Sequence, residues 1–227
     1  MLRPIRYEKK KNVERTIKRT KKYISSQRIV IQSPLTIAFF SVCALLLLVD
    51  PEGSYTHVHF SSSAHLDLFS FSFYKRLLLH PLVHADFNHF FGNMSLFMVL
   101  SPLCEDVLGW KRLLKMIAVT SAFEGVMNAL LTNCNVIGAS GIVFMLVLLA
   151  PICANLHETT QTQIPLCFLI VAAMYIGKEV MEIGTNDGIS HTVHIFGGIG
   201  GAVLGLYGRQ SARQVHFLRR FRIRLFG

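Results

Sequence analysis

The chain has 227 residues, of which 52% are hydrophobic and 16% charged, and its formal net charge is +10. The apolar residues come in blocks, which excludes an ordinary soluble domain and is typical of a membrane protein. Eleven of the 23 Lys and Arg residues lie in residues 1–34 and six follow Tyr207. Basic clusters outside apolar blocks indicate cytoplasmic ends that contact anionic lipid, rather than a surface for nucleic acid.

The two ends of the chain differ in composition from the part between them. Residues 1–33 are polar and basic, and we expect a helix or flexible arm at the membrane surface. Their basic region is too long for a signal peptide. We therefore divide the chain into a basic arm (1–33), a membrane domain (34–208) and a basic tail (209–227). The five cysteines stand singly, so neither a disulfide framework nor a thiolate zinc site is expected.

Six apolar stretches predict six membrane-spanning helices. They are residues 34–49, 89–107, 113–131, 140–154, 164–182 and 190–207. The first is shorter than the about 20 residues that a bilayer span needs. The connection 54–79 is rich in aromatic residues and histidine, so we expect it to lie in the interfacial layer. Six spans place both basic ends on the cytoplasmic side.

This topology brings polar residues from three spans to one depth. His89 and Asn93 begin the second span, Ser140 begins the fourth, and His194 lies near the start of the sixth. All three of these span ends lie just below the outer surface. Polar groups within spans are costly and usually face a cavity or a functional site.

Ser140 stands in a Gly-Ala-Ser-Gly turn that begins at Gly138. Glycine takes backbone angles that are closed to other residues. In the first turn of the helix that follows, unpaired amides favour a negative charge developing beside the serine. These features suit a nucleophile, although an isolated Gly-x-Ser-Gly is more often a serine cap between two loop glycines.

His194 is followed by Gly197 and Gly201, a ridge of small residues that lets another helix approach closely. Gly141 offers a matching flat position, so close packing would bring Ser140 within hydrogen-bond reach of His194. Phe144, one turn below Ser140, could then pack under the imidazole ring. The alternative is that the glycines serve helix packing alone.

His89 and Asn93 are four residues apart and share one helix face. Both side chains can donate hydrogen bonds, and donors aimed beside the Ser140 amide would complete an oxyanion site for acyl transfer. Taken alone, such a pair is more often a satisfied polar pair at the start of a helix.

Five motifs together point to a known family. They are Arg76-x3-His80-x3-His84, His89-x3-Asn93, Glu105-x3-Gly109, Gly138-Ala139-Ser140-Gly141 and His194-x2-Gly197-x3-Gly201. Each is weak alone, but the joint pattern over about residues 75–208 resembles the rhomboid intramembrane serine proteases.

The resemblance implies an all-α, six-transmembrane-helix bundle with Ser140 as nucleophile and His194 as base, a dyad without an acid. His89 and Asn93 would form the oxyanion hole with the Ser140 amide, while Arg76 and His80 would organise the first loop. The implied activity is cleavage of single-span membrane proteins near the outer end of their transmembrane helix. It needs no cofactor or metal, and a bacterial inner membrane suits the chain best.

Several residues depart from the family pattern. Lys75 stands where a tryptophan is common, Phe144 lacks the hydroxyl often found at its position, and His191 replaces a small or amide residue. The resemblance assigns no role to Glu124 or Lys178.

Two rival functions remain open. His80, His84 and His89 suggest a metal transporter, because histidines four residues apart can bind zinc. Pro81 lies between the first two, however, and that reading leaves the serine motif unexplained. The other rival is a non-catalytic protein that binds transmembrane helices, although such proteins typically lose the serine or the histidine.

Overall fold

The structure is a computed structural model that describes residues 16–17, 33–132, 134–157, 166–181, 193–200 and 203. The chain divides into two units, Met1–Gln32 and Ser33–Gly227. The second unit contains α2 (Pro34–Val49), α3 (Thr56–Phe60), α4 (Phe71–Leu79), the 3-10 turn η1 (His80–Leu82), α5 (Phe87–Leu108), α6 (Trp110–Leu131), α7 (Ser140–His157) and α8 (Leu166–Met181). Residues 193–200 are also helical.

All regular elements in these described ranges are helices, and the one β contact among them is an isolated bridge between Ser62 and Val136. The predicted all-α fold is therefore confirmed. The predicted count of six spans is not. By length and composition, α6 with its 22 residues is the one described helix able to cross a membrane by itself. Shorter apolar helices are Pro34–Val49, Ser140–Ala154 and Leu166–Gly177.

Helix boundaries differ from the prediction where a single residue turns the chain. Gly109, at φ 81°, ends α5, and α6 begins at the next residue, Trp110. The two helices are therefore joined by a single residue. α5 begins at Phe87, because the Asp86 side chain accepts a hydrogen bond from the His89 amide and caps the first turn. α7 continues past Ala154 to His157.

The connection between α2 and α5 is more regular than an interfacial loop. It contains α3, α4 and η1. The Asp50 carboxylate accepts hydrogen bonds from Ser54, Tyr55 and Thr56 at the start of α3. These bonds, above all the one from the Thr56 amide, hold the pKa of Asp50 well below its usual range. Large apolar side chains in this connection remain exposed, among them Phe69 and Phe71.

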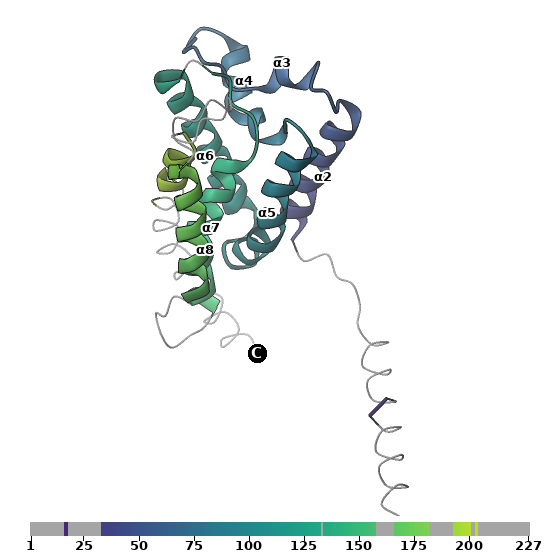
Figure 1. Ribbon diagram of the computed structural model, residues 1–227, viewed down its shortest axis with the longest axis vertical. Helices are drawn as coiled ribbons and strands as arrows, with labels where there is room; N and C mark the ends of the chain where they lie inside the picture. Colours follow the sequence, from purple (N-terminus) through teal and green to yellow (C-terminus); the bar gives the residue numbers. More distant parts are fainter. Residues whose placement is uncertain are drawn as a thin grey trace, which may run out of the picture. The chain divides into compact units, whose positions relative to one another are not determined.

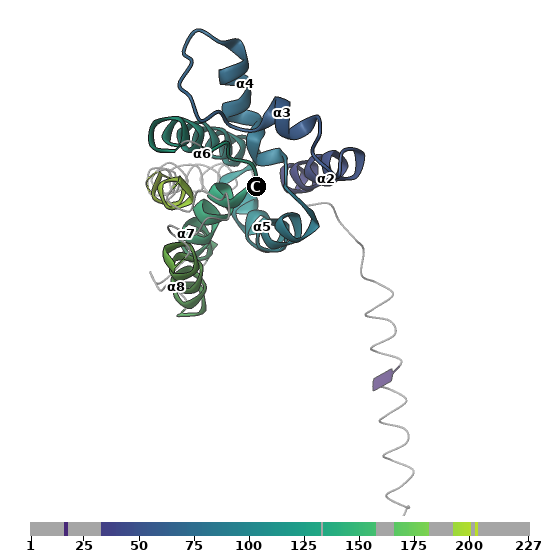
Figure 2. The same ribbon diagram turned by 45° about the horizontal axis from the view of Figure 1, so that its top comes forward.

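α7 is the central helix of the second unit. Figures 1 and 2 show it among α5, α6 and α8, each of which it contacts. From Ala139 to Ala150 its side chains are buried except for the half-buried Leu148. A helix that is apolar all round is expected to lie inside a bundle. α7 therefore holds Ser140 on a rigid support.

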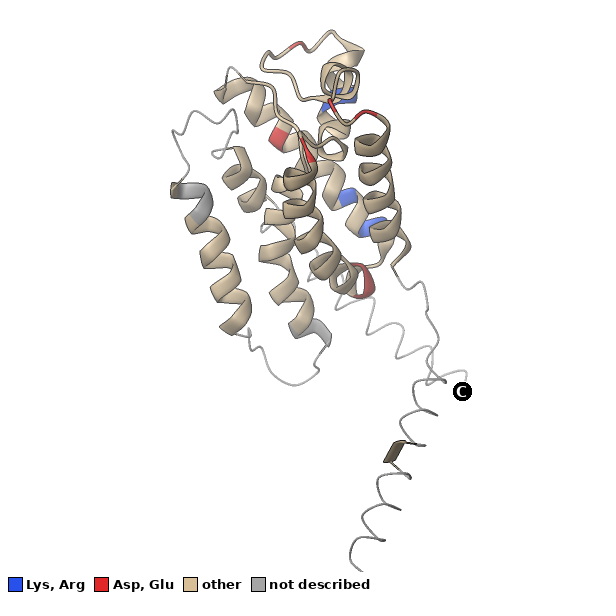
Figure 3. Ribbon diagram, turned by 45° about the vertical axis from the view of Figure 1, so that its right-hand side comes forward, with Lys and Arg blue, Asp and Glu red and all other residues tan. Residues whose placement is uncertain are grey.

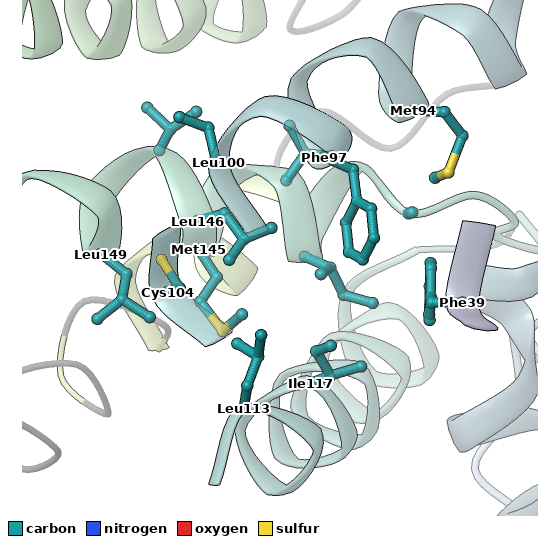
Figure 4. Close-up of a cluster of buried hydrophobic side chains, with 14 of the residues drawn as sticks. Phe39, Met94, Phe97, Leu100, Cys104, Leu113, Ile117, Met145, Leu146 and Leu149 are labelled. Atoms are coloured by element: carbon teal, nitrogen blue, oxygen red, sulfur yellow. The ribbon is translucent and has the colours of Figure 1, made fainter. Parts of the chain in front are cut away.

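The core is built around this helix. Phe39 of α2 stacks on Phe97 of α5 with ring centroids 4.7 Å apart. Met145, Leu146 and Leu149 of α7 are fully buried in the same cluster (Figure 4). The helices carry few charged residues (Figure 3). One of the buried ones, Glu105, has defined hydrogen-bond partners.

Glu105, near the end of α5, joins that helix to the start of α2. Its carboxylate accepts hydrogen bonds from the backbone amides of Leu35 and Thr36, both at 2.9 Å, and from the Thr36 hydroxyl at 2.7 Å. The first amides of a helix have no partner within the helix, and they favour a negative charge. Glu105 is therefore the cap of α2, supplied from a distant part of the chain.

We expect Glu105→Ala to lower the free energy of unfolding by about 3 kcal/mol, because buried amides and a hydroxyl lose a charged acceptor. Thermal unfolding in detergent would measure this. The control is Glu52→Ala, which removes an exposed carboxylate and should leave the midpoint in place. Equal midpoints for the two variants would show that the Glu105 cap is not needed.

Candidate active site

Ser140 and His194 meet between α7 and the helix of residues 193–200. Ser140 Oγ lies 2.6 Å from His194 Nε2, although the residues are 54 positions apart in the chain. Both side chains are buried. When the proton of neutral His194 is on Nδ1, the hydroxyl donates to Nε2, which is the arrangement that a serine nucleophile needs for transfer of its proton.

Glycines allow this contact. A Cβ atom on Gly197 would lie 3.1 Å from the Gly141 Cα, so the two backbones touch where neither residue has a side chain. One residue further, a Cβ on Gly198 would collide with the ring of Phe144. Phe144 packs there and contacts the Tyr175 ring of α8 at 5.6 Å between centroids. Its predicted packing under His194 stays a prediction.

The turn before Ser140 requires glycine for two reasons. Gly138 has φ 103°, which side chains rarely allow. A Cβ there would also lie 2.5 Å from Cε1 and 2.6 Å from Nε2 of His89. The Gly138 amide donates to the His80 carbonyl at 3.0 Å, and Val136 pairs with Ser62. The nucleophile turn is thus tied to the loop between α2 and α5.

His89 and Asn93 lie beside this turn as hydrogen-bond donors. The Ala85 amide donates to His89 Nδ1 at 3.4 Å, so in neutral His89 the proton is on Nε2, the atom that faces Gly138. Asn93 Nδ2 is buried, and within the described ranges it makes no hydrogen bond. Buried donors are normally satisfied, so this amide is suited to an acceptor that arrives with a substrate.

Arg76 and His80 both bind backbone carbonyls around the first loop. Arg76 Nη2 donates to the Val58 carbonyl at 2.7 Å, which links α4 to α3. His80 is fully buried, and its Nε2 donates to the Ser121 carbonyl of α6 at 3.1 Å. Through its own carbonyl His80 also holds Gly138. These contacts join the first loop to α6 and to the nucleophile turn.

Two of the loop histidines are held in their neutral form. Burial lowers the pKa of His80 from 6.5 to about 4, although the hydrogen bond to Ser121 opposes the shift. Burial, followed by the nearby His89, lowers the pKa of His84 to about 3. The His84 ring lies against His89 with centroids 5.2 Å apart. Protonation of either histidine is therefore coupled to unfolding.

We expect stability to fall as the pH drops from about 6.5 to about 4. In that range the unfolded chain binds protons at these histidines while the folded chain does not. Above about pH 6.5 the histidines are neutral in both states, so this loss of stability does not occur there. His80 alone accounts for about 3 kcal/mol at the acid end, since one pKa unit is roughly 1.4 kcal/mol. His80→Gln should flatten the dependence of the unfolding midpoint on pH, and His65→Gln, at an exposed histidine, should not.

An unchanged pH dependence in His80→Gln would contradict this assignment, whatever the absolute stability of the variant. The slope, rather than the midpoint at one pH, is the decisive measurement because the substitution also removes the hydrogen bond to Ser121.

Other residues around the site were not singled out by the sequence. Ser121 offers only its backbone carbonyl to His80, and Asp86 caps the helix that carries His89. Asp86 stands three residues before His89, and an acidic residue in that position is a capping signal that the sequence could have provided. Glu124, left without a role by the sequence, is fully buried beside Gly141. Several predicted features lie outside the described residues: Gly201, His191, the side chain of Lys178, the basic tail 209–227, most of the basic arm 1–33 and part of the predicted span 190–207.

The predicted metal rival gains no support from this geometry. His80 binds a carbonyl, and the His84 ring packs edge-on against the His89 ring. Among the residues that the structure describes, no three or more His, Cys, Asp or Glu side chains converge as metal ligands.

Comparison with known proteins bears on the same part of the chain. A family model described as Rhomboid domain matches residues 72–211, which is more than half of the 227 residues. The matched range includes Ser140, His194 and the residues around them. No curated protein matches the chain.

Proposed function

Since this chain belongs to the rhomboid family of integral membrane proteins, we propose that it is a serine endopeptidase that cleaves transmembrane helices of single-span membrane proteins. Ser140 is the nucleophile and His194 the base. The observation that carries the proposal is the buried hydrogen bond of 2.6 Å between Ser140 Oγ and His194 Nε2. A serine that only capped α7 would have no need of a buried histidine from a distant helix.

The reaction begins with attack of Ser140 Oγ on the scissile carbonyl carbon. The hydroxyl proton passes to His194 Nε2, and the carbonyl oxygen becomes an oxyanion. His194 then protonates the leaving amine, and water hydrolyses the acyl-enzyme with His194 again as the base. No cofactor or metal takes part in this scheme.

The oxyanion is stabilised by donors that are in place before the substrate arrives. His89 Nε2–H, Asn93 Nδ2 and the Ser140 amide are its proposed partners. The free Asn93 donor and the His89 tautomer set by Ala85 support this role. Donors fixed in a site that excludes water stabilise developing charge more than they would in water.

The substrate is a helix that must unwind locally, because backbone hydrogen bonds shield its peptide bonds. Small or helix-breaking residues near its outer end meet this need. The site lies at the start of α7, so cleavage occurs close to one surface of the membrane rather than at the centre of the bilayer.

The arrangement of the whole chain in the membrane is also a proposal. Six spans in residues 34–208 place the basic arm 1–33 and the basic tail 209–227 in the cytoplasm, against anionic lipid. A bacterial inner membrane fits this arrangement best.

Ser140→Ala and His194→Ala are each expected to abolish cleavage of a single-span test substrate reconstituted with the full chain. Both should keep the wild-type unfolding midpoint within a few degrees, since each removes few packing contacts. The controls are Ser95→Ala and His65→Ala at exposed positions. Cleavage by either dyad variant would refute the assignment of the dyad.

Labelling by a fluorophosphonate separates an enzyme from a non-catalytic helix-binding protein. The probe should label the wild type and Ser95→Ala but not Ser140→Ala. A folded wild type that is not labelled and does not cleave would favour the binding protein.

Asn93→Ala should lower kcat about 100-fold or more, with little change in KM, because the lost donor acts mainly on the oxyanion of the transition state. Asn88→Ala is the matched control, an exposed asparagine on the same helix. A rise in KM at constant kcat would instead place Asn93 in substrate binding.

A further inference from the structure

The peptide between His84 and Ala85 lies just before α5 and forms hydrogen bonds through both of its polar groups. Its N–H donates to His89 Nδ1 at 3.4 Å. Its carbonyl oxygen lies 3.3 Å from Nε2 of His57, a residue 27 positions earlier in the chain. A carbonyl oxygen only accepts, so in this contact His57 carries a proton on Nε2 and donates it. A single peptide group therefore connects His57 with the proposed oxyanion donor His89.

The surroundings of His57 fix its ring for this contact. A Cβ atom on Gly53 would collide with three atoms of the imidazole, so the ring packs directly on the Gly53 backbone. Gly53 has φ 68°, a conformation that favours glycine. The Asp50 carboxylate caps the start of α3, and the Val58 carbonyl on the same helix accepts a hydrogen bond from Arg76. His57 is thus presented by a short helix that is anchored at both ends.

The segment that contains this peptide also surrounds His89. The His84 ring is buried and packs edge-on against the His89 ring, with centroids 5.2 Å apart. On the other side of the peptide, the Asp86 carboxylate accepts a hydrogen bond from the His89 amide at 2.8 Å. Three consecutive residues therefore contact His89, and Ala85 is the one whose N–H meets an imidazole nitrogen.

The tautomer of His89 depends on that N–H. A neutral imidazole has one donor nitrogen and one acceptor nitrogen. While the Ala85 N–H points at Nδ1, the proton of His89 stays on Nε2, the atom that faces Gly138. A hydrogen bond to the carbonyl of a peptide polarises the peptide and makes its N–H a better donor. The bond from His57 therefore orients the Ala85 N–H and strengthens its bond to His89.

We propose that His57 is a positioning residue for the oxyanion hole: through this peptide it holds His89 in the tautomer and the orientation that donate to the oxyanion. The inference rests on the proposed function of Ser140 and His194. His57 does not touch the reacting atoms, and it neither gains nor loses a proton during the reaction.

His57→Phe keeps an aromatic ring on Gly53 and removes the hydrogen bond. In the full-length protein, reconstituted with the single-span test substrate, we expect kcat to fall about 2- to 10-fold, the equivalent of one hydrogen bond, with little change in KM. His57→Gln keeps an N–H donor and should retain more of the kcat. The matched control is His59→Phe, the same change two residues later on α3, which should keep the wild-type kcat.

Double variants show whether His57 acts through His89. In a His89→Ala background, His57→Phe should cause no further loss of kcat, because the residue on which it acts is gone. In an Asn93→Ala background the two losses should multiply, since Asn93 is a separate donor. A residue that only stabilised the fold would lower kcat by the same factor in both backgrounds, and that result would overturn the inference.

Nitrogen-15 NMR of the His89 ring gives a readout that needs no substrate. The signals are assigned by their loss in His89→Ala and recorded well above the ordinary histidine pKa of about 6.5. Wild type and His59→Phe should show His89 protonated on Nε2, and His57→Phe should show a mixture of the two tautomers. An unchanged tautomer in His57→Phe, or a wild-type kcat in that variant, would overturn the inference.

The outcome for the dyad is read separately. If Ser140→Ala still cleaves, the proposed function fails. If Ser140→Ala is inactive and His57→Phe keeps the full kcat, only the role of His57 fails. Should His57→Phe not fold, His57→Asn takes its place in the same tests, because its amide is too short to reach the carbonyl that Nε2 binds.

Discussion

The contact between the backbones of Gly141 and Gly197 is the constraint on which the site depends. Lipid tails are as apolar as the side chains of the helices, so helices in a membrane associate through close packing rather than through exclusion of water. With no side chain at either glycine, α7 and the helix of residues 193–200 approach until Ser140 and His194 share a hydrogen bond. A methyl group on either glycine would push the two helices apart or displace Glu124.

The second requirement is rigidity around the serine. α7 is buried along most of its length, so Ser140 stands at the end of a helix that is packed on all sides. Before it, the turn is held by the hydrogen bond from Gly138 to His80, and His80 is itself held by the Ser121 carbonyl. A catalytic geometry that must be accurate to a fraction of an ångström needs such support from its neighbours.

Several polar groups in this apolar bundle satisfy the backbone of a helix end or a loop. Glu105 caps α2, Asn128 binds two loop carbonyls, and the half-buried Arg76 binds the Val58 carbonyl. In each case the polar group satisfies backbone that would otherwise lose its partner. Asn93 Nδ2, like the ring nitrogens of His84, makes no hydrogen bond within the described ranges, and it lies near Gly138. This donor is the observation on which the proposed oxyanion role of Asn93 rests.

The sequence by itself determined the all-helical class, the glycine turn before Ser140 and the family, because these depend on local composition and on spacing along the chain. It also paired His89 with Asn93, since four residues make one helical turn. The sequence predicted that Ser140 and His194 would come within reach, but the contact itself, 2.6 Å across 54 positions, belongs to the tertiary structure, because spacing along a helix does not specify which face turns toward which neighbour. For the same reason the place of Glu124 beside Gly141 could not be read from the chain: it follows from how α6 and α7 are rotated against each other.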